Sequence, residues 1–324
     1  MTDKNIKVRQ LGRYIGAEIE EIDLADELSD LQVEQIRDAL LEHELIIFRD
    51  QNITTEQHVA FGRRFGNLTI HPFSPNREDM PEVIVLDNDG ENPPHYTDVW
   101  HADETFREAP PMGTILRSWI VPPIGGDTLF TSMTTAYEAL SDRMKSLLDE
   151  LVAVHDFVPF RKLFDANQES RMKIRELEDT YPNPAHPVVS VHPETGRSVL
   201  NINPQFTVAI KDMKEIESRA ILDLLLRHSH VPDFQYRLVW EANTIIFWDN
   251  RSTHHYATHD YFPHRRRMER ITLEGTKPEA VNQSNTSAEI TARFGKKEIY
   301  RADTVGKSRK GTGADRGKRQ FSRS

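Results

Sequence analysis

His101, Asp103 and one of the neighbouring histidines His254 and His255 could together bind a metal ion. His101 and Asp103 lie two residues apart, and side chains with this spacing on a strand point the same way. His254 and His255 follow a predicted strand, and either one could supply a third ligand from the rim of a barrel. Two histidines and one carboxylate on one face leave three metal positions open. That arrangement suits a ferrous ion that binds a bidentate co-substrate and dioxygen together.

The His-x-Asp spacing does not establish a metal site by itself. The chain has fourteen histidines, so one such pair is expected by chance. His192 and Glu194 have similar spacing, but Pro193 and Gly196 place them in a predicted hairpin turn, where we expect no metal. The spacing therefore needs support from other residues.

An arginine cluster near residue 266 offers that support. Arg266 and Arg270 are four residues apart, so on a strand they face the same side. A guanidinium meets both oxygens of a carboxylate, as binding of a dicarboxylate co-substrate requires. The alternative interpretation of a basic run is a solvated strand end.

The surrounding elements predict a mainly β fold with helical decorations. Capping-box spacing begins helices at Ser29, ending near Leu41, and at Thr54, ending near Gly66. Further helices are expected at 133–140 and 142–151, and Asp212 is expected to cap another. The segment 162–178 is expected to be a mobile insertion. Strands are predicted at 45–48, 83–86, 114–121, 127–130, 188–192, 198–202, 234–239, 244–248 and 268–273. Many short strands indicate a closed antiparallel barrel or a jelly roll.

Composition excludes several classes of site. The chain has no cysteine, so disulfides, thiolate metal sites and cysteine nucleophiles are absent. The net charge is −10, and residues 301–324 carry +6, which leaves −16 on the remainder. This argues against a nucleic-acid-binding body. The basic tail is expected to be disordered, with a nucleic-acid-binding arm as the alternative. No membrane-spanning run and no secretory signal are found, which favours a cytoplasmic location.

The chain resembles the taurine dioxygenase (TauD/TfdA) family over about residues 8–278. The matching segments occur in family order, and they are Trp100-His101-Ala102-Asp103, Gly125-Gly126-Asp127-Thr128, Trp248-Asp249-Asn250-Arg251, His255-Tyr256-Ala257, Arg266, Arg270, Gly16-Ala17-Glu18-Ile19, Phe48-Arg49-Asp50-Gln51 and Arg64-Phe65-Gly66. The resemblance implies a double-stranded β-helix (jelly roll, cupin-like) with helical decorations. It also implies one dioxygenase domain over 1–279, followed by the basic tail at 280–324.

The resemblance also implies roles for particular residues. The iron ligands are His101, Asp103 and His255, the last preferred over His254 because the family's ligand directly precedes Tyr-Ala. The groups that hold 2-oxoglutarate are Thr128 and Arg266, with Arg270 able to share it. The substrate pocket is implied to contain His71, Phe73, Thr97, Phe160, Phe206 and Arg270, with His71 and Arg270 facing an anion.

The expected function is an iron(II)/2-oxoglutarate-dependent dioxygenase that uses O2 to hydroxylate a small anionic organic substrate. Succinate and CO2 are released, usually with an aldehyde or ketone and the anion. Asp103 favours hydroxylation, because related halogenases lack this carboxylate. Family members specific for taurine have Tyr, Asn and a small polar residue where this chain has Phe73, Thr97 and Phe160. Alkyl sulfates, other alkanesulfonates or aryloxyalkanoates are therefore expected instead of taurine.

Two other functions would fit the same residues. One alternative function is a metal-dependent hydrolase, in which the same ligands activate a water molecule. Another is a catalytically silent jelly-roll binding module, although all three candidate ligands and both arginines are present. The resemblance also implies a homo-oligomer, either a dimer or a tetramer, with no nucleic-acid or membrane partner for the folded domain.

Overall fold

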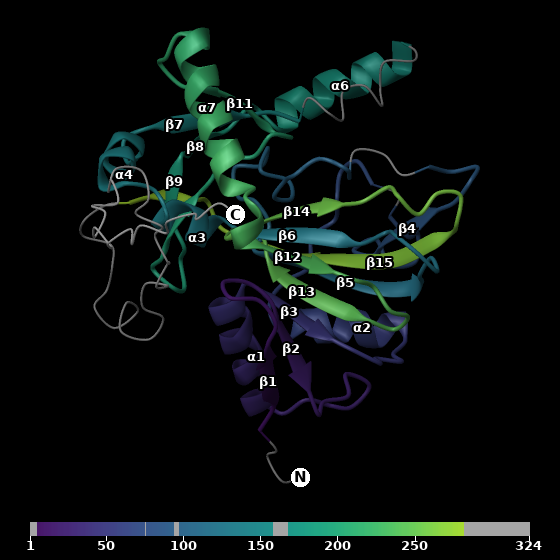
Figure 1. Cartoon of the computed structure of the whole chain (residues 1–324). Helices are drawn as coiled ribbons and strands as arrows, with labels where there is room; N and C mark the ends of the chain where they lie inside the picture. Colours follow the sequence, from purple (N-terminus) through teal and green to yellow (C-terminus); the bar gives the residue numbers. More distant parts are fainter. Residues whose placement is uncertain (1–4, 75, 94–96, 158–167, 282–324) are drawn as a thin grey trace, which may run out of the picture.

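Two facing β-sheets form the centre of the molecule (Figure 1). The structure is a computed structural model that describes residues 5–74, 76–93, 97–157 and 168–281. The large sheet has the strand order β1-β2-β3-β13-β5-β15-β4, and the small sheet has the order β12-β6-β14. Their bounds are β1 Lys7–Gln10, β2 Ala17–Glu20, β3 Leu45–Phe48, β13 Ile245–Asp249, β5 Gly113–Ile120, β15 Arg266–Leu273, β4 Ile84–Asn88, β12 Gln235–Leu238, β6 Thr128–Ser132 and β14 Thr253–Ala257. This arrangement matches the predicted jelly roll.

Alternation along the central strands divides their side chains between two apolar layers. On β13, Ile246 and Trp248 face the small sheet, where the Trp248 ring centroid lies 5.6 Å from that of Phe130 on β6. Ile245 and Phe247 point the other way, toward the helices on the outer face of the large sheet. Because β13 is covered on both faces, it appears in the sequence as an uninterrupted apolar run.

Helices α1 (Asp30–His43) and α2 (Thr55–Arg63) pack against the outer face of the large sheet, as Figure 1 shows. Both begin with the predicted capping boxes. The Ser29 hydroxyl accepts a hydrogen bond from Gln32 N, while the Gln32 side chain accepts one from Ser29 N. Thr54 and Gln57 make the same reciprocal pair. Each pair satisfies two backbone donors that a helix N-terminus otherwise leaves unpaired.

A second, smaller layer lies on the side of the small sheet. It contains helices α3 (Met133–Glu138), α4 (Asp142–Leu148), α6 (Gln168–Thr180) and α7 (Glu215–Ser229), the 3-10 turn Pro232–Phe234, and strands β7 Val152–His155, β8 Ala185–Pro187, β9 Val189–Val191, β10 Ser198–Leu200, β11 Thr207–Ile210 and β16 Glu279–Ala280. The predicted hairpin is confirmed, since β9 pairs antiparallel with β10. Among the described residues, no helix is both long and apolar enough to cross a membrane.

Two predictions in this layer were wrong. Asp212 does not cap α7, because its φ of 60° lies in the left-handed region. Lys214 is the N-cap, and its backbone N–H donates to the Glu217 carboxylate at 3.1 Å. The segment 162–178 was expected to be a mobile insertion and no helix was predicted there, but residues 168–180 form helix α6. Residues 162–167 lie outside the described residues, as does the tail from 282 onward.

His58 on α2 predicts how acid affects stability. Burial, with a contribution from Arg117, lowers the pKa of His58 to about 3. The unfolded chain therefore binds a proton near pH 6.5 that the folded chain does not bind, so stability is present above pH 6.5 and falls as the pH drops toward 3. Between pH 7.5 and 5 this term is about 2 kcal/mol.

The variant His58→Leu should lose about 2 kcal/mol less than the parent over that interval, measured by urea unfolding at both pH values. His264→Leu is the control, because His264 is exposed. Equal acid sensitivity in the parent and in His58→Leu would contradict the assignment of a neutral, buried His58.

Candidate metal centre and substrate pocket

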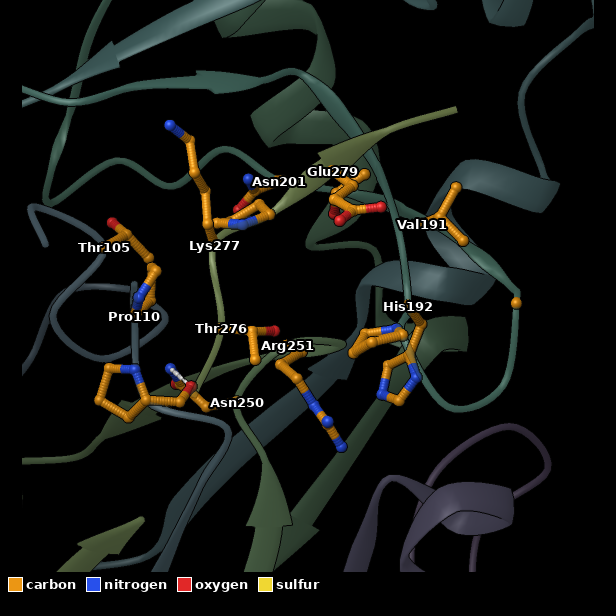
Figure 2. A pocket seen from close by; sticks show the side chains of 15 residues that line it. Thr105, Pro110, Val191, His192, Asn201, Asn250, Arg251, Thr276, Lys277 and Glu279 are labelled. Atoms are coloured by element: carbon orange, nitrogen blue, oxygen red, sulfur yellow. Dashed lines mark hydrogen bonds between the residues drawn. The ribbon is translucent and has the colours of Figure 1, made fainter. Parts of the chain in front are cut away.

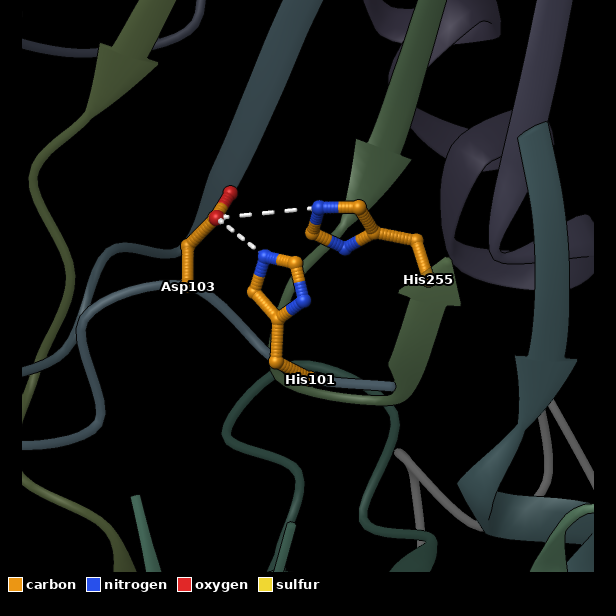
Figure 3. Close-up of side chains that lie close together, drawn as sticks. All are labelled: His101, Asp103 and His255. Carbon is orange, nitrogen blue, oxygen red and sulfur yellow. Dashed lines mark ion pairs between the residues drawn. The ribbon is translucent and has the colours of Figure 1, made fainter. Parts of the chain in front are cut away.

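Three predicted ligand residues converge next to β14, the strand of the small sheet that carries His255 (Figure 3). His101 and His255 are joined by two main-chain hydrogen bonds, His101 N to His255 O at 3.0 Å and His255 N to His101 O at 2.8 Å. The Nε2 atom of each imidazole lies 3.7 Å from Oδ1 of Asp103. All three side chains are buried. The structure thus brings together residues 154 positions apart along the chain, as the sequence predicted.

The local reason for this convergence differs from the prediction. His101 forms only an isolated bridge with His255, and Asp103 lies in the turn that follows, so the two ligands do not share a strand. Asn250, in the turn after β13, orients Asp103 instead. Its Oδ1 accepts from Asp103 N at 2.6 Å, and its Nδ2 donates to Asp103 O at 3.0 Å.

The donor atoms fit a divalent cation. His101 Nδ1 lies 2.7 Å from the carbonyl oxygen of Val99, so this nitrogen carries the proton and Nε2 presents a lone pair to Asp103. A lone pair facing a carboxylate oxygen at 3.7 Å is repulsive unless a cation lies between them. The separation of 3.7 Å is shorter than about 4.2 Å, twice a typical metal–nitrogen distance, so one ion can reach both atoms.

Electrostatics place these ligands in their metal-binding protonation states. Burial lowers the pKa of His101, and burial together with His101 lowers the pKa of His255. Both imidazoles are therefore neutral near pH 7. Burial alone would raise the pKa of Asp103, but the positive charge of Arg270 holds it below its usual range. Its Oδ2 also accepts a hydrogen bond from the Thr114 hydroxyl at 2.9 Å.

Asn250→Ala should weaken both the fold and the metal site. It removes the two bonds to Asp103 and one to Pro111 O at 3.1 Å, leaving buried backbone groups unpaired. We expect a loss of about 2–4 kcal/mol in urea unfolding and roughly 10- to 100-fold weaker metal binding by titration. The control is Asn201→Ala, which removes one hydrogen bond of 3.3 Å. Unchanged metal affinity in Asn250→Ala would show that Asp103 is held by other contacts.

Arg266 and Thr128 line the same cavity as the three candidate ligands. The Arg266 side chain is buried, its Nε has no hydrogen-bond partner, and it forms no ion pair with a carboxylate of the described residues. Its guanidinium stands 5.6 Å from the Trp240 ring centroid, and burial lowers its pKa to about 10. The Thr128 oxygen accepts from Trp240 Nε1 at 3.0 Å, which leaves its own proton to donate. A buried guanidinium without a counter-ion suits a bound carboxylate.

Arg270 lies closer to the three ligands. Its Nη2 is 2.9 Å from Asp103 Oδ2, and its Nε donates to the Thr272 hydroxyl at 3.2 Å. His71 stands nearby, and its Nδ1 accepts from Phe73 N at 3.1 Å, so the neutral ring carries its proton on Nε2. Burial, followed by the Arg270 charge, lowers the pKa of His71 to about 3. Both side chains line the cavity and can donate to an anion.

An aromatic cluster forms one wall of this cavity of about 430 Å³. The rings of Phe73 and Phe157 stack at 5.6 Å, and Phe106 meets Phe206 edge-on at 5.4 Å. Of the predicted substrate residues, Phe73 and Phe206 therefore belong to an apolar wall. Thr97 also lines the cavity, but its hydroxyl lies 2.8 Å from His259 Nε2. Phe160 lies outside the described residues.

Figure 2 shows a second cavity, of about 470 Å³, which Thr105 and His192 help to line. Asn250 lines it, as does Arg251, whose guanidinium pairs with Asp249 at 2.6 Å and with Glu194 at 2.7 Å. His192 Nε2 lies 2.9 Å from the same aspartate, so His192 and Glu194 both belong to this ionic network. Because its main cation is already paired, this cavity is a weaker candidate for a reactive site.

One protein family model matches most of the chain. The family described as "Taurine catabolism dioxygenase TauD, TfdA family" matches residues 7–272. The chain belongs to this family. The resemblance seen in the sequence is thereby confirmed, and so is the class of the enzyme, a 2-oxoglutarate-dependent dioxygenase that uses iron(II) and O2.

Several members of the TauD/TfdA family are similar to this chain along most of their length. An "Alkylsulfatase" from Acinetobacter baylyi is 35% identical over 277 residues, covering 84% of this chain and 86% of that protein. An "Alpha-ketoglutarate-dependent sulfate ester dioxygenase" from Pseudomonas putida is 33% identical, covering 86% and 92%. The crystal structure of a taurine dioxygenase from Burkholderia xenovorans superposes with a TM-score of 0.73 at 37% identity, covering 85% and 93%.

The sequence did not single out several residues that the structure places around Asp103. Thr114 and Asn250 both hydrogen-bond to Asp103, and Glu104 and Arg107 form a buried ion pair next to it. Asn250 lies within a segment quoted for the family, which was the available signal. His254 remains close to His255 but faces away from Asp103, and its Nδ1 lies 3.2 Å from His230 Nε2.

Proposed function

We propose that His101, Asp103 and His255 bind the iron(II) of this dioxygenase. The observation that carries the proposal is the meeting of two neutral imidazole nitrogens and one ionised carboxylate, with 3.7 Å from each Nε2 to Oδ1. The three protein ligands leave positions for a bidentate co-substrate and O2. The chemistry that iron, 2-oxoglutarate and O2 supply is oxidative decarboxylation to succinate and CO2, coupled to hydroxylation of a C–H bond.

Arg266 and Thr128 are the proposed partners of the far carboxylate of 2-oxoglutarate. Arg266 contributes a buried positive charge without a protein counter-ion, and Thr128 contributes a hydroxyl proton. Trp240 orients both, since it donates to the threonine oxygen and lies against the guanidinium. Such a fixed pair of donors orients the co-substrate and adds no reorganisation cost when it binds.

The proposed substrate is a small organic anion with an apolar body, and alkyl sulfate esters fit best. Arg270 and His71 donate to the anion, and the wall that contains Phe73 and Phe206 contacts the carbon chain. The relatives named for alkyl sulfates and sulfate esters support this choice. Hydroxylation at the carbon that bears the sulfate gives a product that collapses to an aldehyde and releases sulfate.

A panel of substrates tests this proposal by succinate release and oxygen consumption. Alkyl sulfates should give the highest kcat/KM, with aldehyde and sulfate formed in equal amounts to succinate. Alkanesulfonates and aryloxyalkanoates should follow, and taurine should be the poorest, because Phe73 supplies no hydrogen bond for an amine. Preference for taurine would reject the apolar-wall argument. Turnover without oxygen consumption would indicate the hydrolase instead, and absence of turnover would indicate a silent binding module.

The family resemblance also supports a homo-oligomer, a dimer or a tetramer, which light scattering coupled to size-exclusion chromatography can test. A cytoplasmic location, the domain division at residue 279 and the disordered basic tail remain predictions. The strand β16, Glu279–Ala280, pairs with β9 at that proposed boundary.

A further inference from the structure

A second carboxylate lies beside the arginine that is proposed to bind the substrate anion. Glu104 directly follows Asp103, and its side chain is 2% exposed. Its Oε2 accepts from Arg107 Nε at 2.6 Å. Its Oε1 has no hydrogen-bond partner and lies 3.9 Å from both Arg270 Nη2 and His71 Nε2. This oxygen therefore faces the two groups that would bind an anion.

The backbone holds Glu104 in this place. Its φ of 51° lies in the left-handed region, which non-glycine residues seldom occupy. Arg107 closes the turn by donating its backbone N–H to Glu104 O at 2.9 Å, and its guanidinium bonds the carboxylate. Arg107 also donates to Ile70 O at 3.1 Å, which ties the turn to the segment that carries His71. Strained backbone of this kind persists where the surroundings fix it, often at functional sites.

The charges around the cavity leave room for one negative charge. The two positive charges of iron(II) balance the two negative charges of 2-oxoglutarate. Asp103 balances one of the two arginines, Arg266 and Arg270. Arg107 balances Glu104, and Arg265 balances Asp87, which also lines the cavity. One positive charge remains, and it is the charge that a singly charged substrate neutralises. A second negative charge on the substrate would have no partner and would lie close to Glu104 Oε1.

We propose that Glu104 determines specificity for charge at the anion end of the substrate pocket. Its carboxylate disfavours doubly charged groups, such as phosphate esters, relative to singly charged sulfate esters of the same shape. This inference rests on the proposed function, because it takes Arg270 and His71 as the anion-binding groups. Discrimination by a like charge acts against the wrong ligand and costs the right ligand much less.

The test compares hexyl sulfate with hexyl phosphate. Calorimetric binding is measured without oxygen at pH 8.5, on protein loaded with iron(II) and 2-oxoglutarate, where the phosphate ester carries two charges because its second pKa is about 6. The parent should prefer hexyl sulfate. Glu104→Gln keeps an acceptor for Arg107 and should improve the affinity for hexyl phosphate relative to hexyl sulfate by about 10- to 100-fold.

Two further variants secure the comparison. Glu108→Gln removes an exposed carboxylate that pairs with Lys277 outside this cavity, so the ratio of affinities should not change. If Glu104→Gln does not fold, replacing Glu104 and Arg107 together by leucine removes the carboxylate and leaves no buried charge unpaired. This pair of substitutions should shift the ratio in the same direction.

Each other outcome overturns the inference in a recognisable way. An equal change for both esters would mean that Glu104 has a structural role only. Loss of hexyl phosphate binding in Glu104→Gln would mean that the carboxylate favours the phosphate ester, which is the opposite of the inference. If neither ester binds the parent protein, the proposed anionic substrate class fails, and this inference fails with it.

Discussion

Replacing any one of His101, Asp103 or His255 with alanine is expected to abolish iron-dependent succinate formation while the fold survives. Each side chain supplies one of the three protein donors of the proposed site, and the Nε2 atom of each histidine lies 3.7 Å from Oδ1 of Asp103. We expect a loss of roughly a thousandfold or more, because a bound metal contributes several kcal/mol and each 1.36 kcal/mol is tenfold in rate. Succinate release, metal content and circular dichroism measure activity, binding and fold separately.

His254→Ala is the matched control for this experiment. His254 is as buried as its neighbour, but it lies beside His230 and not beside Asp103. The variant should lose stability, since a buried side chain leaves a cavity, yet each folded molecule should still bind one iron. If His255→Ala stays active and His254→Ala does not, the third ligand has been assigned to the wrong histidine.

Much of the fold could be predicted from local sequence, because its strongest signals are local. The capping boxes at Ser29 and Thr54 depend on residues three positions apart, and the structure shows both. The apolar run at Leu45–Phe48 predicts a strand covered on both faces, which β3 is. The prediction that Asp212 caps a helix was wrong because an aspartate favours both helix caps and left-handed turns. Only the contacts of the folded chain decide between the two.

The sequence indicated which three residues come together at the candidate metal site, but not which contacts orient them. The spacing of His101 and Asp103 suggested a shared strand, whereas a turn and Asn250 orient the aspartate. That hydrogen bond joins residues 147 positions apart, so no local pattern contains it. Glu104 was missed for a similar reason. In the sequence it resembles an ordinary surface acid next to Asp103, and only tertiary packing shows that it is buried against Arg107 and near Arg270.

The two arginines of β15 should separate co-substrate binding from substrate binding. Arg266→Ala should raise the apparent constant for 2-oxoglutarate and reduce even the decarboxylation that occurs without substrate. Removing a charge-assisted, buried bond to an anion costs about 2–5 kcal/mol, or roughly 30-fold to several thousandfold in affinity. Arg270→Ala should weaken the alkyl sulfate by a similar factor and leave 2-oxoglutarate binding mostly intact.

Because Arg270 contacts Asp103, Arg270→Ala is expected to affect iron binding as well as substrate binding. Arg270 Nη2 lies 2.9 Å from Asp103 Oδ2 and helps to lower the pKa of that carboxyl, so Arg270→Ala should raise this pKa and weaken iron binding at low pH. Kinetics are therefore compared at saturating iron and at pH 7.5 or above, where Asp103 stays ionised in both proteins. Arg266 has no such contact, so its variant should show no added dependence on iron concentration. If Arg270→Ala under these conditions impairs only 2-oxoglutarate binding, the substrate is not an anion held by Arg270, and a neutral substrate becomes the better proposal.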